Sequence, residues 1–276
     1  MGLRGRVSTF RHGALAQRWV APVTRRVRRE LQWRRAGIGR LERGSLDGPE
    51  HLVAEHATPL FRELSGLEID LQRGKVVNLQ IAADALDGIL LRPGETFSFW
   101  RHVGGPSARR GFTDGLVLDH GELTRGIGGG MCQFTNLLYW MTLHTALTVT
   151  ERWRHSYDVF PDAGRTQPFG SGATCAWPVL DLQIRNETDA VHRLTVRVTG
   201  THLEGRWSAD RPSAMTYEVY EAHHRLTNDA PGVFQRHNVL RRRVFDADGA
   251  TVADDVVAVN QALLRYAPFL EQGPST

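Results

Sequence analysis

The sequence predicts an α+β protein in which helices and strands alternate at first and strands alone follow. Apolar residues recur at helical spacing from Cys132 to about Ala146, and short β-branched runs bounded by turn residues surround this segment. After Gly172, apolar runs at strand length are separated by Gly, Pro, Asn and Asp signals. We therefore expect a mixed core around a glycine loop and core helix at residues 46–172, with an antiparallel β-rich part packed on it at 173–276.

The individual elements follow from local signals. "NLQIAADALDGILLRPGETFSFW" predicts a helix over 78–86, a stop at Gly88 and two short strands separated by a Pro-Gly turn. "GLVLDHGELTRGIGGG" predicts a hairpin that pairs 116–118 with 122–125, and "LTVTERW" predicts a strand after the core helix. The chain has 276 residues, of which 41% are hydrophobic, which is enough for a substantial core.

The first 45 residues form a basic amphipathic segment. They hold twelve arginines against two glutamates, whereas the rest of the chain is net acidic. Three interpretations stay open: a helix on an anionic membrane, a nucleic-acid arm, and a solvated helix packed on its own domain. No nucleic acid is expected, because no groove-reading motif accompanies the charge. The predicted apolar side of the helix consists of Trp19, Val20, Val23, Val27 and Leu31.

Hydropathy and the start of the chain bear on location. No stretch reaches the roughly 18 apolar residues of a membrane-spanning helix, and the chain opens without an apolar secretory signal. We expect a cytoplasmic protein, with peripheral contact of residues 1–45 with the inner membrane face as the alternative.

The segment "RGIGGGMCQFTNLLYW" carries the candidate chemistry. Gly128, Gly129 and Gly130 directly precede Cys132 at a predicted helix start, where free backbone N–H groups and the helix dipole favour a thiolate and can hold an oxyanion. His155, in the loop after the next strand, is the candidate base. The alternative is that the cysteine is a small buried hydrophobe and the histidine a hydrogen-bonded loop residue. Candidates to orient the histidine are Asp158, Asp119, Asp162 and Asn186.

Other site types have little support in the sequence. No cysteine pair has zinc-ligand spacing, and "GIGGG" lacks the lysine of a phosphate loop, so we expect neither a metal nor another cofactor. Arg109, Arg110 and Arg125 are interpreted as solvated surface, with carboxylate or phosphate binding as the alternative.

Five motifs together resemble the VanW family: "LRPGETFSFW", "GIGGGMCQFTNLLYW", "ERWRHSYDVFPDAGR", "PFGSGAT" and "RNETD". The family is associated with glycopeptide (vancomycin) resistance, and some larger surface-anchored relatives are L,D-transpeptidases that use the motif cysteine. The resemblance implies that Cys132 is the acyl-accepting nucleophile and His155 its base. It further implies a substrate-binding role for Gly128, Gly129, Gly130, Gln133 and Ser156. Cys175 has no counterpart in the family pattern and is given no role.

Two functions follow as hypotheses. The first is a Cys132-dependent acyl transferase or hydrolase that acts on a peptidoglycan stem peptide or precursor. The second is a non-enzymatic accessory protein that binds a cell-wall precursor or a protein partner, with Cys132 in a structural role.

Overall fold

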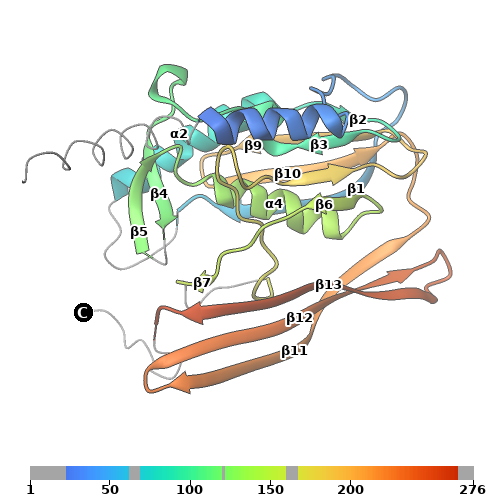
Figure 1. The fold of residues 1–276 in the computed structure, drawn as a ribbon. Coiled ribbons are helices and arrows are strands. Elements are labelled where there is room, and N and C mark those ends of the chain that lie inside the picture. Colours follow the sequence, from blue (N-terminus) through green and yellow to red (C-terminus); the bar gives the residue numbers. More distant parts are fainter. Residues whose placement is uncertain (1–22, 62–68, 120–121, 160–166, 267–276) are drawn as a thin grey trace, which may run out of the picture.

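A computed structural model of the protein describes residues 23–61, 69–119, 122–159 and 167–266 (Figure 1). Its centre is an antiparallel sheet with the strand order β1 (His51–Pro59), β10 (His202–Ala209), β9 (His192–Val198) and β2 (Ile89–Leu91). A smaller antiparallel sheet has the order β3 (Thr96–Ser98), β8 (Gln183–Arg185) and β6 (Thr148–Glu151). The predicted hairpin is present as β4 (Asp114–Asp119) and β5 (Glu122–Ile127).

Two helices, α2 (Ile69–Leu86) and α4 (Met131–Leu143), cover the central sheet. The short α3 (Phe99–Val103) packs on α2 and on β3 of the smaller sheet, and a 3₁₀ turn η1 (Ala108–Arg110) follows it. Helix α4 packs on β1 and β10, and α2 packs on β9. Gly205 of β10 makes the α4 contact possible, because a Cβ there would lie 2.7 Å from the Met141 methyl group. The core helix is therefore confirmed, and its residues Phe134, Leu137 and Leu138 are fully buried.

Helix α2 begins at Ile69, earlier than the predicted start at residue 78. Gly74 weakens the local helix signal, since glycine is a poor helix former. The tertiary structure explains its presence: a Cβ on Gly74 would lie 1.9 Å from the carbonyl oxygen of Asp114 in β4. The close approach of the hairpin to this helix could not be predicted from the neighbouring residues in the sequence.

The last three strands form a separate layer below the core, in orange and red in Figure 1. β11 (Thr216–Ala230), β12 (Val233–Phe245) and β13 (Thr251–Leu264) are antiparallel, and the short β7 (Tyr157–Asp158) pairs in parallel with β13. The α+β class is thereby confirmed. The strands after Gly172 do not all join one sheet, however, because β8, β9 and β10 pair with strands from the first half of the chain.

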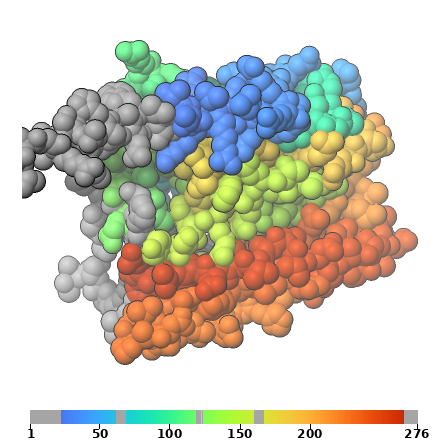
Figure 2. Space-filling model, in the orientation of Figure 1, coloured from blue at the N-terminus to red at the C-terminus, as the bar shows by residue number. Residues whose placement is uncertain are grey.

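Residues 23–35 form a helix on the protein surface, blue in Figures 1 and 2. The described part of the predicted apolar side, Val23, Val27 and Leu31, is exposed, whereas Arg29 and Trp33 of the same helix are buried. Arg29 is tolerated there because core carbonyl and carboxylate groups accept hydrogen bonds from its guanidinium.

The other two members of the predicted apolar side, Trp19 and Val20, lie outside the described residues. None of the described helices has both the length and the apolar character needed to cross a membrane.

Candidate functional site

A tight glycine turn links β5 to α4. Gly128 and Gly130 have φ values of +78° and +97°, which favour glycine. Gly129 packs directly against β4, since a Cβ there would lie 2.2 Å from the carbonyl carbon of Gly115. The three glycines are thus required by backbone conformation and close packing.

The amides of this turn are already used inside the protein. Gly128 N donates to Thr113 O at 2.9 Å, and Gly130 N donates to Leu116 O at 2.9 Å. Gly129 N donates within the turn at 3.0 Å. These three N–H groups are therefore occupied and are not available to an oxyanion. The candidate donors are the amides that follow them.

Those following amides belong to Met131 and Cys132, the first two residues of α4. Within the described ranges, no residue accepts a hydrogen bond from either amide, and the N-cap Gly130 has no side chain to do so. The helix start therefore offers free N–H donors beside the Cys132 thiol.

Cys132, Cys175 and His155 lie together, although they come from three segments. An antiparallel bridge between Trp153 and Thr174 places the segment before His155 beside the segment of Cys175. Helix α4 holds the latter segment, because Thr135 Oγ1 donates to Ala173 O at 2.6 Å. The fold thus brings the predicted nucleophile and base together and adds a second thiol.

The Cys132 thiol is half-buried and has an unusual environment. Its Sγ lies 3.6 Å from the carbonyl oxygen of Cys175. The pKa of Cys132 is lowered well below its ordinary value, first by a hydrogen bond from the Cys175 side chain and further by a hydrogen bond and charge from His155. These effects outweigh desolvation, which by itself would raise the pKa of this thiol.

Cys175 behaves in the opposite way. Desolvation raises the pKa of this buried thiol well above its ordinary value, and the adjacent Cys132 and the charge of Asp181 raise it further. The pKa values of the two thiols are therefore shifted in opposite directions, and Cys132, next to His155 and the helix start, is the more acidic of the pair. Cys175, to which the family resemblance assigns no role, thus lies in contact with Cys132.

The remaining predicted site residues have the following places. Gln133 Nε2 donates to Thr58 Oγ1 at 3.0 Å and to Pro59 O at 2.8 Å, which ties α4 to the end of β1. Ser156 is exposed, and its carbonyl oxygen accepts a hydrogen bond from Leu263 N, which anchors the His155 loop to β13. A substrate-binding role for these residues stays a prediction.

The candidates to orient His155 are engaged elsewhere or lie outside the described part. The carboxylate of Asp158 is 3.4 Å from Arg236 Nη1 and accepts from Tyr266 OH at 3.1 Å. The Asn186 side chain is bound within its own turn, to Leu91 O and Ala190 O. The Asp119 side chain and Asp162 are not among the described groups.

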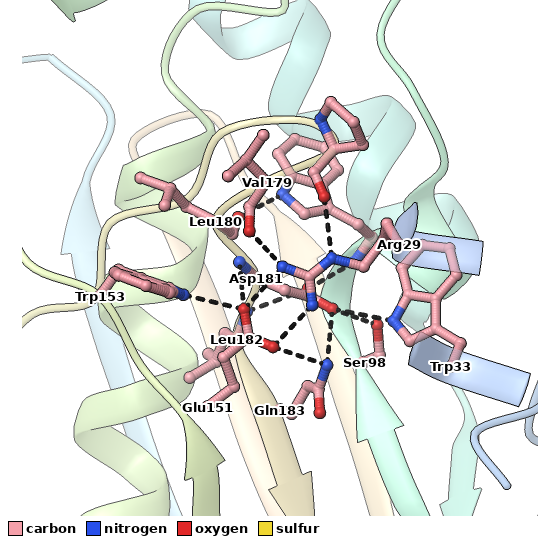
Figure 3. A network of polar contacts seen from close by, with 12 residues as sticks. Arg29, Trp33, Ser98, Glu151, Trp153, Val179, Leu180, Asp181, Leu182 and Gln183 are labelled. Atoms are coloured by element: carbon pink, nitrogen blue, oxygen red, sulfur yellow. Dashed lines mark hydrogen bonds and ion pairs between the residues drawn. The ribbon is translucent and has the colours of Figure 1, made fainter. Parts of the chain in front are cut away.

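A buried polar network behind the site was missed by sequence reasoning (Figure 3). Asp181 Oδ2 accepts from Ser98 Oγ at 2.5 Å and Oδ1 accepts from Trp100 N at 3.0 Å. Desolvation raises the pKa of the Asp181 carboxyl, while these hydrogen bonds oppose the shift. Glu151 lies next to it and forms a bidentate pair with Arg29 at 2.7 and 2.8 Å.

This network fixes the segment that carries Cys175. It joins helix 23–35, the start of α3 and the end of β6 to residues 178–183. Arg29 and Trp33 lie four residues apart on one side of the basic helix, but their buried partners Glu151 and Asp181 lie far along the chain and are not indicated by this local pattern.

Comparison with known proteins agrees with the motifs of the glycine turn and its surroundings. Residues 74–208 match a family model described as "VanW like protein". The chain is 32% identical over 216 residues, 78% of each chain, to the vancomycin B-type resistance protein VanW of Enterococcus faecalis. It is also 31% identical over 110 residues to the uncharacterized protein YoaR of Bacillus subtilis, which covers 40% of this chain and 35% of that one.

No solved structure gives a significant match. The family is established by the sequence relationship, which spans the glycine turn, α4 and both cysteines. This chain belongs to the VanW family.

Proposed function

We propose that the protein is a cysteine-dependent acyl transferase or hydrolase that acts on a peptidoglycan stem peptide or precursor. The observation that carries the proposal is the Cys132 thiol, whose pKa is lowered by Cys175 and His155 at the start of α4. A low thiol pKa at a helix start is typical of nucleophilic cysteines. The Enterococcus relative is a vancomycin B-type resistance protein, which supports a cell-wall substrate.

The reaction uses the groups that lie at this site. The Cys132 thiolate attacks the carbonyl carbon of a substrate amide, and the free amides of Met131 and Cys132 stabilise the developing oxyanion. As the C–N bond breaks, protonated His155 donates its proton to the leaving amine, and a thioester forms on Cys132. An incoming amine or water then attacks the thioester and gives its proton to His155, which releases the product and restores the thiolate.

The test is covalent adduct formation. The full chain is incubated with synthetic stem peptides that contain D-amino acids, and the protein mass is followed together with the released amine. We expect an acyl adduct on Cys132, no adduct in Cys132→Ala, and a strongly slowed reaction in His155→Ala. His223→Ala, at an exposed histidine of β11, is the matched control and should react normally.

Turnover by Cys132→Ala equal to that of the unchanged protein would rule out this mechanism. Peptide binding without adduct or turnover in every variant would instead favour the accessory-protein hypothesis, in which Cys132 is structural.

A second proposal concerns location: the helix at 23–35 contacts an anionic membrane, at the inner face of the cell membrane. Its exposed residues Val23, Val27 and Leu31 border a shallow apolar depression, and the same helix carries exposed arginines. Flotation with vesicles tests this proposal. Binding to anionic but not neutral vesicles, lost in Val27→Glu, is expected; equal binding by Val27→Glu would contradict it.

A further inference from the structure

A basic pocket lies beside the thiol site and has no place in the chemistry proposed above. Its volume is about 510 Å³. The wall is made by helix 23–35 with the loop after it, by α3 and η1 with the loop between them, and by a tryptophan two residues after Cys175. The lining residues that matter are Arg26, Arg40, Arg101, Arg110, Ser107 and Trp177.

The charge of this pocket is not balanced. Glu30, the acidic residue among the described lining residues, accepts hydrogen bonds from Arg101 Nη1 with both carboxylate oxygens, at 2.8 and 2.9 Å. In the part of the chain that the structure describes, no carboxylate pairs with Arg26, Arg40 or Arg110. Three cationic side chains therefore line the pocket without a counter-charge from any described residue.

One of these guanidiniums is held in place. Arg110 donates to Gly105 O at 2.8 Å and to Val103 O at 2.6 Å, and it stacks against Phe112 at 5.3 Å. These contacts use only part of its donors, and a planar guanidinium in a fixed orientation suits the oxygens of an anion. Gly104 packs closely on this guanidinium, since a Cβ there would lie 2.9 Å from Arg110 Nη1, and its φ value of +72° favours glycine.

Further neutral groups are suited to a ligand. Ser107 is the N-cap of η1, but its hydroxyl makes no capping hydrogen bond. The Trp177 ring lies 5.9 Å from Trp100 and 6.1 Å from Trp33, so aromatic surface adjoins the cationic groups. Such a tryptophan wall suits a ligand in which a ring or another apolar group adjoins the charged group.

We propose that this pocket binds a diphosphate group. Three unpaired guanidiniums match a multiply charged phosphate oxyanion better than a single carboxylate, and guanidinium groups pair with phosphate oxygens through charge-assisted hydrogen bonds. The tryptophan wall contacts the part of the ligand that carries the diphosphate.

The pocket and the thiol site share two segments. Trp177 follows Cys175 closely, and Pro106 packs on the glycine turn, since a Cβ on Gly128 would lie 2.4 Å from the Pro106 Cβ. A ligand anchored in the pocket is thus held next to the segments that position Cys132. The inference itself is about binding and does not rest on Cys132 chemistry.

Calorimetric titration of the full chain with inorganic diphosphate, at constant ionic strength, tests the proposal. The test variant is the double change Arg26→Gln and Arg40→Gln, at two exposed arginines of the pocket wall. The control is the double change Arg25→Gln and Arg35→Gln, which removes the same amount of charge from helix 23–35 at positions that do not line this pocket.

We expect saturable binding that the test variant weakens about tenfold or more, because each lost charge-assisted hydrogen bond has a large effect. The control and Cys132→Ala should keep the affinity of the unchanged protein. Loss of affinity in Cys132→Ala, equal weakening in the control, or no saturable binding would overturn the proposal.

Two further ligands show whether the diphosphate group belongs to a soluble molecule or to a lipid. Binding of a soluble nucleoside diphosphate that responds to the test variant supports the site and assigns a soluble ligand. If inorganic diphosphate binds and, of these two further ligands, only vesicles that contain a diphosphate-linked lipid respond to the test variant, the site is supported and the ligand is a lipid.

Discussion

The buried His102 should make the protein sensitive to acid, and His102→Gln should remove that sensitivity. His102 Nε2 accepts a hydrogen bond from Leu41 N at 2.9 Å, and its Nδ1–H donates to Ser98 O at 2.8 Å. A proton on Nε2 would face the Leu41 N–H and break this contact. Burial lowers the pKa of His102 to about 4, and the charges of Arg40 and Arg101 add to the effect.

The sign and size of the effect follow from linkage. The pKa of an unfolded histidine is near 6.5, so between this value and about 4 the unfolded chain binds a proton that the folded protein does not. The contribution is fully present above pH 6.5 and is lost as the pH falls toward 4. A difference of this size corresponds to about 3 kcal/mol in the free energy of unfolding.

Urea unfolding followed by circular dichroism at pH 7.5, 5.5 and 4 measures this contribution. The unchanged protein should lose about 3 kcal/mol more than His102→Gln over this range, since other acid-sensitive groups act equally in both proteins. His223→Gln, at an exposed histidine, serves as control and should follow the unchanged protein. Parallel pH profiles for the unchanged protein and His102→Gln would refute the reasoning.

Three more predictions test the surroundings of the site. Arg29→Ala should lower the free energy of unfolding in urea by about 3 kcal/mol, because it leaves the partly buried Glu151 carboxylate without its cation. Arg34→Ala, at an exposed arginine of the same helix, should lower it by at most about 0.5 kcal/mol. Equal losses would contradict a stabilising role of the buried Arg29–Glu151 pair. Gly129→Ala should lower the free energy of unfolding by about 2 kcal/mol or more, because the new Cβ overlaps the β4 backbone; an unchanged melting temperature would be incompatible with this packing. Peroxide should oxidise the Cys132 thiolate to a sulfenic acid, which the Cys175 thiol converts to a disulfide with release of water, seen as the loss of two hydrogens by mass spectrometry and absent in Cys175→Ala. A protein that accumulates sulfenic acid without closing the bond would show that the two thiols do not meet.

The local pattern was sufficient for much of the fold. Helix α4, the β4–β5 hairpin, β2 and the long C-terminal strands were all predicted, because each has a clear period or a glycine or proline boundary. Helix α2 was predicted too short, since Gly74 serves a contact with β4 instead of the helix itself. The pairing of β8–β10 with early strands could not be predicted, because register and partner depend on long-range contacts.

The candidate site divides in the same way. The sequence alone determined that a cysteine follows a glycine turn at a helix start and that a histidine follows the next strand, since both are properties of neighbouring residues. Only the tertiary structure decided that Cys175 lies next to Cys132, that the glycine amides are occupied, and that Arg29 is buried while Val27 is exposed. The physical reason is that hydrogen-bond satisfaction and burial depend on groups brought from distant parts of the chain, whereas helix and turn signals are local.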